Sequence, residues 1–180
     1  MTEPQTALMW VNHFDLLPGD PSVKTSSNAI DSGVGGGLTG LVVRSTTTGE
    51  IGQGGGNKVV HMALEVPPGY IIKRVRVCYE LSNSRSFISQ IRLSQVANPP
   101  DHADVILDDG TDHRSPGPVC VASAETTVDP GLGAVLLDLR VNFGDTGDRI
   151  VVRALGLRLQ RAEARTAPTR PLAGAGRPSG

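Results

Sequence analysis

A chain of 180 residues, of which 38% are hydrophobic, is long enough to build one domain with a substantial core. Its formal net charge of -1 provides no overall field to attract nucleic acid or an anionic membrane, so we expect neither as a partner. Aromatic residues make up only 3%, whereas 22 glycines and 13 prolines favour many short strands joined by turns over long helices.

The first twenty residues concentrate large apolar side chains ahead of a Pro-Gly-Asp turn. We expect residues 1–20 to be ordered, either as an edge strand of a sheet or as an arm that packs on a neighbouring subunit. The segment lacks the basic and apolar regions of a secretory signal, and no later stretch is long enough to cross a bilayer. The sequence therefore predicts a cytoplasmic protein, with non-classical export as the alternative.

Residues 21–57 are rich in Gly, Ser and Thr, and we interpret them as loops around a short strand at Leu41–Val43. Gly35, Gly37 and Gly40 have the G-x-G-x-x-G spacing of dinucleotide-binding loops, which requires a preceding strand and a following helix. No strand precedes them and the β-prone LVVRSTTT follows. A loop or a bulged strand is therefore the preferred interpretation.

The most regular pattern runs from Val66 to Val96, where apolar and polar residues alternate with the period of two of an extended chain. With Ser82–Arg85 as the turn, this stretch predicts a hairpin of two antiparallel strands that share one apolar wall. The residues expected on that wall are Ile71, Val75, Val77, Tyr79, Leu81, Phe87, Ile91 and Leu93.

Similar apolar rows occur over residues 59–66, 134–143 and 149–159, with shorter strands around Val105–Leu107 and Cys120. In the last row the apolar phase changes, which predicts a bulge between Arg153 and Gly156. The sequence therefore predicts an all-β, antiparallel β-sandwich of jelly-roll or immunoglobulin-like type with roughly seven to nine strands. Residues 58–160 form its core, in one domain with residues 1–57, and residues 161–180 form a disordered tail.

Outward-facing arginines on the predicted strands suggest an interaction surface. Together with the apolar N-terminal segment, they favour a non-enzymatic structural or interaction module whose partner is another protein or a second copy of this chain, as a homo-oligomer. The candidate surface residues are Trp10, Phe14, Arg74, Arg76, Arg92 and Arg140.

The densest group of candidate metal ligands lies between residues 101 and 113. Carboxylate oxygens suit calcium, and mixed histidine and aspartate ligands suit zinc or manganese, but the spacing matches no EF-hand. We prefer a turn with solvated acids and no cofactor, with a calcium or other divalent cation site as the alternative. The candidate ligands are Asp101, His102, Asp104, Asp108, Asp109, Asp112 and His113.

A carbohydrate-binding module is the alternative function, because small β-sandwiches host many unrelated binding functions. Sugar platforms need exposed aromatic faces, for which Trp10, Tyr70 and Tyr79 are the candidates, although Tyr79 falls on the predicted core face. An enzyme is not expected, since no local signature surrounds Cys78 or Cys120. In a cytoplasmic protein both cysteines are expected to be reduced thiols.

Overall fold

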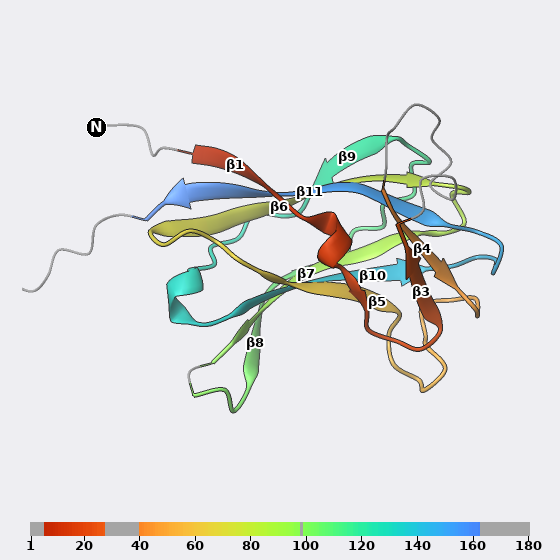
Figure 1. Cartoon of the computed structure of the whole chain (residues 1–180), viewed down its shortest axis with the longest axis horizontal. Coiled ribbons are helices and arrows are strands. Elements are labelled where there is room, and N and C mark those ends of the chain that lie inside the picture. Colours follow the sequence, from red (N-terminus) through yellow and green to blue (C-terminus); the bar gives the residue numbers. More distant parts are fainter. Residues whose placement is uncertain (1–5, 28–39, 98, 163–180) are drawn as a thin grey trace, which may run out of the picture.

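The computed structural model describes residues 6–27, 40–97 and 99–162, which form eleven β-strands and two short 3-10 helices (Figure 1). No helix in these ranges has the length and apolar character needed to cross a membrane. Gly35 and Gly37, and the tail expected to be disordered from residue 163 onward, lie outside the described residues.

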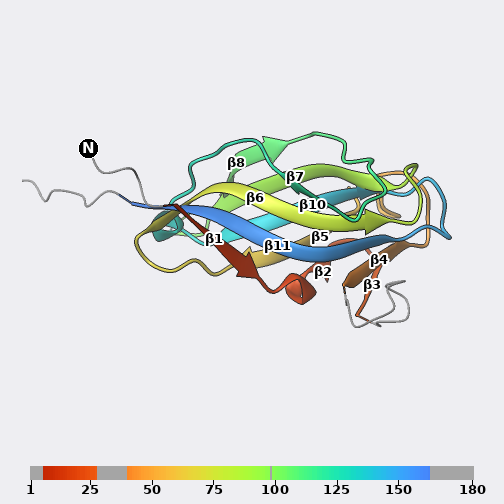
Figure 2. The same cartoon turned by 90° about the horizontal axis from the view of Figure 1, so that it is seen from above.

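The strands form two antiparallel sheets, seen from two directions in Figures 1 and 2. The six-stranded sheet has the order β3-β4-β11-β6-β9, with β1 also paired to β11. Its strands are β1 (Thr6–Val11), β3 (Val23–Ser26), β4 (Leu41–Ser45), β6 (Tyr70–Leu81), β9 (Val119–Ala122) and β11 (Ile150–Arg161). The five-stranded sheet has the order β2-β5-β10-β7-β8. Its strands are β2 (Leu17–Pro18), β5 (Val59–Leu64), β7 (Phe87–Val96), β8 (Ala103–Asp109) and β10 (Val135–Asn142).

This arrangement confirms the all-β antiparallel sandwich, and the strand order is that of a jelly roll. The 3-10 helices are η1 (His13–Asp15), after β1, and η2 (Pro130–Leu132), before β10. The strands outnumber the seven to nine expected because β2 and β3, of two and four residues, are too short to show a clear alternation, whereas the short strand expected around Cys120 is β9.

The hairpin expected over Val66–Val96 is wrong. β6 pairs with β11 and β9 in one sheet, whereas β7 pairs with β10 and β8 in the other. Both strands direct one apolar row into the same core, so the alternation is identical whether consecutive strands lie side by side or face each other. The chain crosses between sheets again from β10 to β11.

Backbone irregularities decide which residues of the long strands face the core. The register of β11 against β6 shifts between Val152 and Ala154, which confirms the bulge expected near Arg153. A second shift lies opposite Lys73, so that Ile72, rather than the expected Ile71, is fully buried. Each bulge adds one residue, after which the side chains that would have faced outward face the core. The apolar residues on both sides of the bulge therefore point into the core.

The cysteines are joined, contrary to the expectation of reduced thiols. Cys78 of β6 lies directly opposite Cys120 of β9, with 3.9 Å between the Cα atoms, and the two form a disulfide. The expected compartment gives no information on which residues are neighbours, whereas strand pairing brings the two side chains together across 42 residues of chain. The short edge strand β9 is thereby covalently attached to the centre of its sheet.

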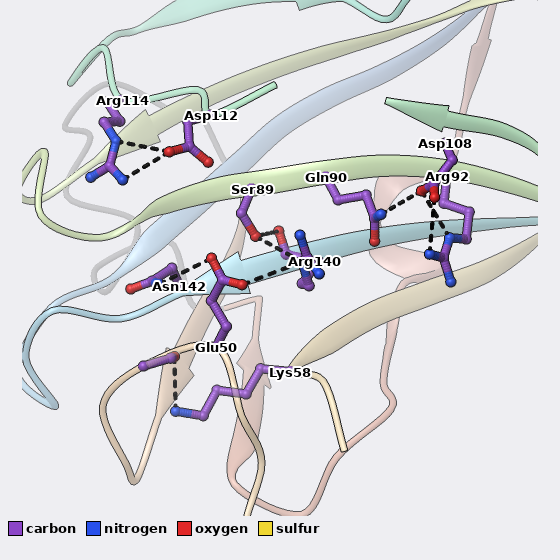
Figure 3. Close-up of polar contacts among 11 residues, drawn as sticks. Glu50, Lys58, Ser89, Gln90, Arg92, Asp108, Asp112, Arg114, Arg140 and Asn142 are labelled. Carbon is purple, nitrogen blue, oxygen red and sulfur yellow. Dashed lines mark hydrogen bonds and ion pairs between the residues drawn. The ribbon is translucent and has the colours of Figure 1, made fainter. Parts of the chain in front are cut away.

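Lys58 is a fully buried lysine at the start of β5. Its ammonium group donates hydrogen bonds to the carbonyl oxygens of Thr47 at 2.6 Å, Thr48 at 2.6 Å and Gly49 at 3.1 Å. Figure 3 shows Lys58 with one of these contacts. Burial lowers the pKa of Lys58, and the carboxylate of Asp20 opposes this effect. The three bonds satisfy the buried charge and anchor the loop between β4 and β5.

Asp148 links the two loops in which the chain passes from one sheet to the other, between β6 and β7 and between β10 and β11. Its carboxylate accepts hydrogen bonds from Arg85 Nε at 2.8 Å, from Arg85 Nη2 at 3.1 Å and from Ser86 Oγ at 2.7 Å. Ser86 Oγ in turn accepts a bond from the Gly144 amide at 2.9 Å. The bonds from Arg85, and then from Ser86, lower the pKa of the buried Asp148 carboxyl below its usual value.

We expect Asp148→Asn to reduce the free energy of unfolding at pH 7 by about 1–3 kcal/mol, because the substitution removes charge-assisted hydrogen bonds from a buried group. The folded-state pKa of Asp148 is below its unfolded value, so its contribution is complete above pH ~5 and disappears as the pH falls through the folded pKa. Urea denaturation from pH 7 down to pH ~2 measures the difference between wild type and variant, which should shrink in acid. Asp145→Asn is the control, since Asp145 is half exposed and lies 3.6 Å from Arg85. An equal loss in both variants would contradict the role given to Asp148.

Candidate functional site

Trp10 lies exposed on the outer face of the six-stranded sheet. In β1 the side chains of Met9 and Val11 pack against the core, so Trp10, between them, faces outward and is 54% exposed. Its partner across the strands is Gly156 of β11. A Cβ atom added to Gly156 would lie 3.1 Å from Cε3 of the indole. The tryptophan ring therefore lies against a backbone position that has no side chain, and this fixes how the ring is presented.

A groove of about 620 Å³ lies beside Trp10 and is lined by residues of β1, η1, β2, β5 and β10. We call it the Trp10 groove. Its apolar lining comes from Met9, Val11, Leu17, Met62, Ala63 and Leu136, together with Trp10 itself. Its polar lining comes from Asn12, Asp15, His61 and Glu65. The groove thus combines one large aromatic surface with several groups that donate or accept hydrogen bonds.

The turn after β1 positions one of the carboxylates in the groove. Asn12 caps the short helix η1 by accepting a hydrogen bond from the Phe14 amide at 3.3 Å. Its Nδ2 atom donates to Oδ1 of Asp15 at 2.9 Å. The bond from Asn12 orients the carboxylate of Asp15. Because each carboxylate oxygen can accept more than one hydrogen bond, Asp15 can still accept further hydrogen bonds from a ligand.

A row of mainly polar residues crosses the outer face of the five-stranded sheet. Strand register places Leu17, His61, Asp138, Arg92 and Asp108 side by side on β2, β5, β10, β7 and β8 in turn. His61 Nδ1 lies 3.8 Å from Asp138 Oδ1. Burial raises the pKa of Asp138, and the neighbouring His61 and Arg92 partly offset that rise. Since Leu17 and His61 also line the Trp10 groove, the groove continues into this row.

Asp108 is held by two side chains of β7 (Figure 3). Arg92 donates from Nε to Oδ1 at 3.2 Å and from Nη2 to Oδ2 at 3.3 Å, and Gln90 Nε2 also donates to Oδ1. This two-pronged contact fixes the planes of both charged groups. Their side chains remain partly exposed, at 32% for Arg92 and 49% for Asp108, so solvent or a ligand can reach them.

A second polar group lies on the same sheet around Arg140. Its Nε lies 3.1 Å from Ser89 Oγ and 3.6 Å from Oε2 of Glu50, whose other oxygen accepts from Asn142 Nδ2 at 3.2 Å (Figure 3). The outer face of the five-stranded sheet thus presents alternating donors and acceptors whose positions are set by contacts within the chain.

Two of the arginines expected to pair with a neighbouring chain, Arg92 and Arg140, pair within their own chain instead. Arg74 contacts Glu125 at 3.4 Å, and no described residue pairs with Arg76. Phe14, on η1, is 37% exposed and lies outside the Trp10 groove.

The structure does not bring the candidate metal ligands of residues 101–113 together. Asp101 and Asp104 contact opposite nitrogens of His102, Nδ1 at 2.6 Å and Nε2 at 3.7 Å, so the three groups do not converge on one point. Asp109 caps the turn at Thr111 and accepts from the Ala124 amide at 2.6 Å. Over the described ranges, no group of three or more histidine, cysteine, aspartate or glutamate side chains has a metal-binding arrangement.

The remaining candidates in this segment have other partners. Asp108 contacts Arg92, as described above, and Asp112 pairs with Arg114 at 2.8 Å. His113 is buried, and burial lowers its pKa. This segment therefore acts mainly as an edge strand and the turn that follows it.

Of the three aromatic candidates for a sugar platform, Trp10 is the exposed one. Tyr79 is buried, as its place in the apolar row predicted, and Tyr70 packs partly against the core. Sequence reasoning did not select Asn12, Asp15 or Asp138, because none of them belongs to a motif. The signal that could have indicated the platform is Gly156, a glycine inside a strand of large apolar residues, which marks a close approach by another group.

Comparison with known proteins identifies structures of similar shape. No protein-family model and no curated protein matches the chain. A solved structure of the N-terminal endo-1,4-β-D-xylanase 10B of Clostridium thermocellum, its CBM22-1 and GH10 modules complexed with xylohexaose, has a TM-score of 0.54 and 11% identity. The match covers 85% of this chain and 27% of that chain. At this identity the similarity establishes the β-sandwich fold.

Two further solved structures resemble the chain less closely. The CBM22-1 xylan-binding domain of Xyn10C from Paenibacillus barcinonensis has a TM-score of 0.49 and 12% identity, over 82% of this chain and 87% of that chain. The carbohydrate-binding module CBM36, in complex with calcium and xylotriose, has a TM-score of 0.43 and 9% identity. That match covers 84% of this chain and 98% of that chain.

The comparisons overturn the structural or self-assembling interaction module that the sequence favoured. A solved structure that shares this fold carries a carbohydrate-binding module. The contacts explain the error, because outward arginines on a strand can equally be matched by acids of their own chain. Arg92 is matched by Asp108 on the next strand, and Arg140 by Glu50 in the loop between β4 and β5.

We expect Gly156→Val to push the indole of Trp10 off the sheet, because even a single Cβ atom at this position is within 3.2 Å of Trp10 and Leu8. Trp10 is the only tryptophan of the chain, so its fluorescence reports this site directly. The emission maximum should move to longer wavelength while thermal unfolding stays cooperative. Gln160→Val, on the same strand and the same side, should leave the spectrum unchanged. Unaltered emission in the Gly156 variant would show that the ring does not lie against this glycine.

Proposed function

We propose that this protein is a carbohydrate-binding module that holds an oligosaccharide in the Trp10 groove and along the adjoining polar face. The observation that supports this most strongly is the exposed indole of Trp10, held against Gly156 at a groove that also contains Asp15, His61 and Glu65. A sugar ring has an apolar C–H face that packs on an aromatic ring and hydroxyls that bond to carboxylates, imidazoles and amides at its edge.

The paired charges of the five-stranded sheet support the same function. Arg92 holds Asp108 through two hydrogen bonds, and Glu50 forms an ion pair with Arg140 and accepts a hydrogen bond from Asn142. Groups that are ordered before a ligand arrives lose little conformational entropy when they bind it. A face with fixed donors and acceptors suits the many hydroxyls of a sugar chain better than an apolar protein partner.

The proposal assigns binding rather than catalysis. Cys78 and Cys120 form a disulfide, so neither is a free thiol nucleophile. The disulfide also supports folding in an oxidising compartment, unlike the cytoplasm expected from the sequence. Because the xylanase structure that shares the fold was solved with xylohexaose, β-1,4-linked xylo-oligosaccharides are the first ligands to test.

The test is a titration of the protein with xylohexaose, followed by tryptophan fluorescence and by calorimetry. We expect a saturable change in Trp10 emission. Trp10→Ala should lower the affinity at least about tenfold, or about 1.4 kcal/mol, because a buried aromatic contact is lost on the ligand side. Calorimetry measures that variant, which has no tryptophan signal.

Leu132→Ala is the matched control, since Leu132 is 57% exposed but does not line the Trp10 groove. Its affinity should equal that of the wild type. The proposal fails if xylohexaose and a broader array of neutral oligosaccharides produce neither heat nor a fluorescence change, or if the Trp10 and Leu132 variants bind alike.

A further inference from the structure

A second hollow, of about 390 Å³, lies on the outer face of the six-stranded sheet and is strongly basic. Three arginines line it, Arg74 and Arg76 from β6 and Arg158 from β11. The first residues of β1, including Thr6 and Leu8, complete its wall. We call it the arginine hollow.

Strand register concentrates positive charge in the arginine hollow. Arg74 lies directly opposite Arg158, and Arg76 is the next residue on the same face of β6. Like charges directly opposite each other on neighbouring strands oppose folding, so their juxtaposition is a cost unless an anion is present. The chain as a whole carries a net charge of -1, which makes this a local excess rather than a general property of the surface.

Few acids offset these arginines. Glu125 contacts Arg74 at 3.4 Å and is itself 62% exposed. Across the described part of the chain, no side chain pairs with Arg76 or Arg158. In addition, Nε of Arg74 is shielded from solvent and has no hydrogen-bond partner. Guanidinium groups bind carboxylates and other oxyanions through paired N–H donors, so the hollow has unused capacity for one such group.

The arginine hollow and the Trp10 groove are both lined by residues of β1. Trp10, Gly156 and Arg76 lie in one row across β1, β11 and β6. The first half of β1 lines the arginine hollow and its second half lines the Trp10 groove, so a ligand lying along β1 would reach both. Figure 1 shows β1 beside β11.

We propose that the arginine hollow binds the carboxylate of an acidic sugar residue carried by the same glycan that occupies the Trp10 groove. This inference rests on the function proposed above and specifies its ligand as an acidic glycan. The arginines recognise the charge, and Trp10 provides the apolar surface for a neighbouring sugar ring. A carboxylate fits because its two oxygens match the two parallel donors of a guanidinium group.

The experiment compares two ligands that differ only in charge. One is a xylo-oligosaccharide with a single glucuronic acid side group, and the other is the same molecule after its carboxyl group has been reduced to an alcohol. Calorimetry on the wild type should give an affinity about tenfold higher for the acidic form. The preference should weaken when sodium chloride is raised from about 50 mM to about 500 mM, because salt screens exposed charges.

The double variant Arg76→Gln/Arg158→Gln should bind both ligands with the affinity that the wild type shows for the reduced one. Arg149→Gln/Arg161→Gln removes the same charge from residues that do not line the hollow, and it should keep the full preference. Loss of the preference in both double variants would overturn the inference, since a general charge effect would then account for it.

Other outcomes separate this inference from the proposed function. If the wild type binds the two ligands with equal affinity, the role proposed for the arginine hollow is wrong, whereas the role proposed for the Trp10 groove is unaffected. No binding of either ligand overturns both proposals. If a hexaglutamate peptide competes as well as the acidic glycan, or a sulfated xylo-oligosaccharide binds more tightly, the assignment to a sugar carboxylate is wrong.

Discussion

The pairing of β6 with β11 is the constraint on which the rest of the structure depends. The two strands pair along almost their whole length, from Tyr70 and Arg161 to Leu81 and Ile150. The other edge of β11 is shared, since its first residues pair with β4 and the remainder pairs with β1. The bulge at Arg153 separates these two parts and restores the inward phase of the apolar residues after it. Because β1 pairs with β11, the position of the exposed tryptophan depends on this central strand.

The same pairing brings together the parts of the candidate binding surface. It places Arg76 beside Gly156, and the pairing of β1 with the other edge of β11 places Trp10 against the same glycine. The Trp10 groove then leads to the polar row of the five-stranded sheet, and the arginine hollow lies on the outer face of the six-stranded sheet. One edge strand, β1, therefore contributes to both hollows, which is why a single extended ligand can be proposed for them.

Sequence patterns predicted the strands well and their neighbours poorly. The rows over residues 59–66, 134–143 and 149–159 correspond to β5, β10 and β11, and the phase change near Arg153 is a real bulge. The hairpin of β6 and β7 was wrong because alternation specifies the buried face of a strand but not the strand beside it. The disulfide was missed for the same reason, since only the pairing of β6 with β9 brings Cys78 and Cys120 together.

By itself, the sequence determined the all-β class, the apolar rows of the long strands and the shortage of aromatic residues that leaves Trp10 as the exposed candidate. Only the tertiary structure decided that Trp10 lies against Gly156, that Arg92 and Arg140 are matched within the chain, and that Arg74, Arg76 and Arg158 share a hollow. The physical reason is that a period of two encodes the direction of a side chain, whereas strand order and register decide which distant side chains it meets.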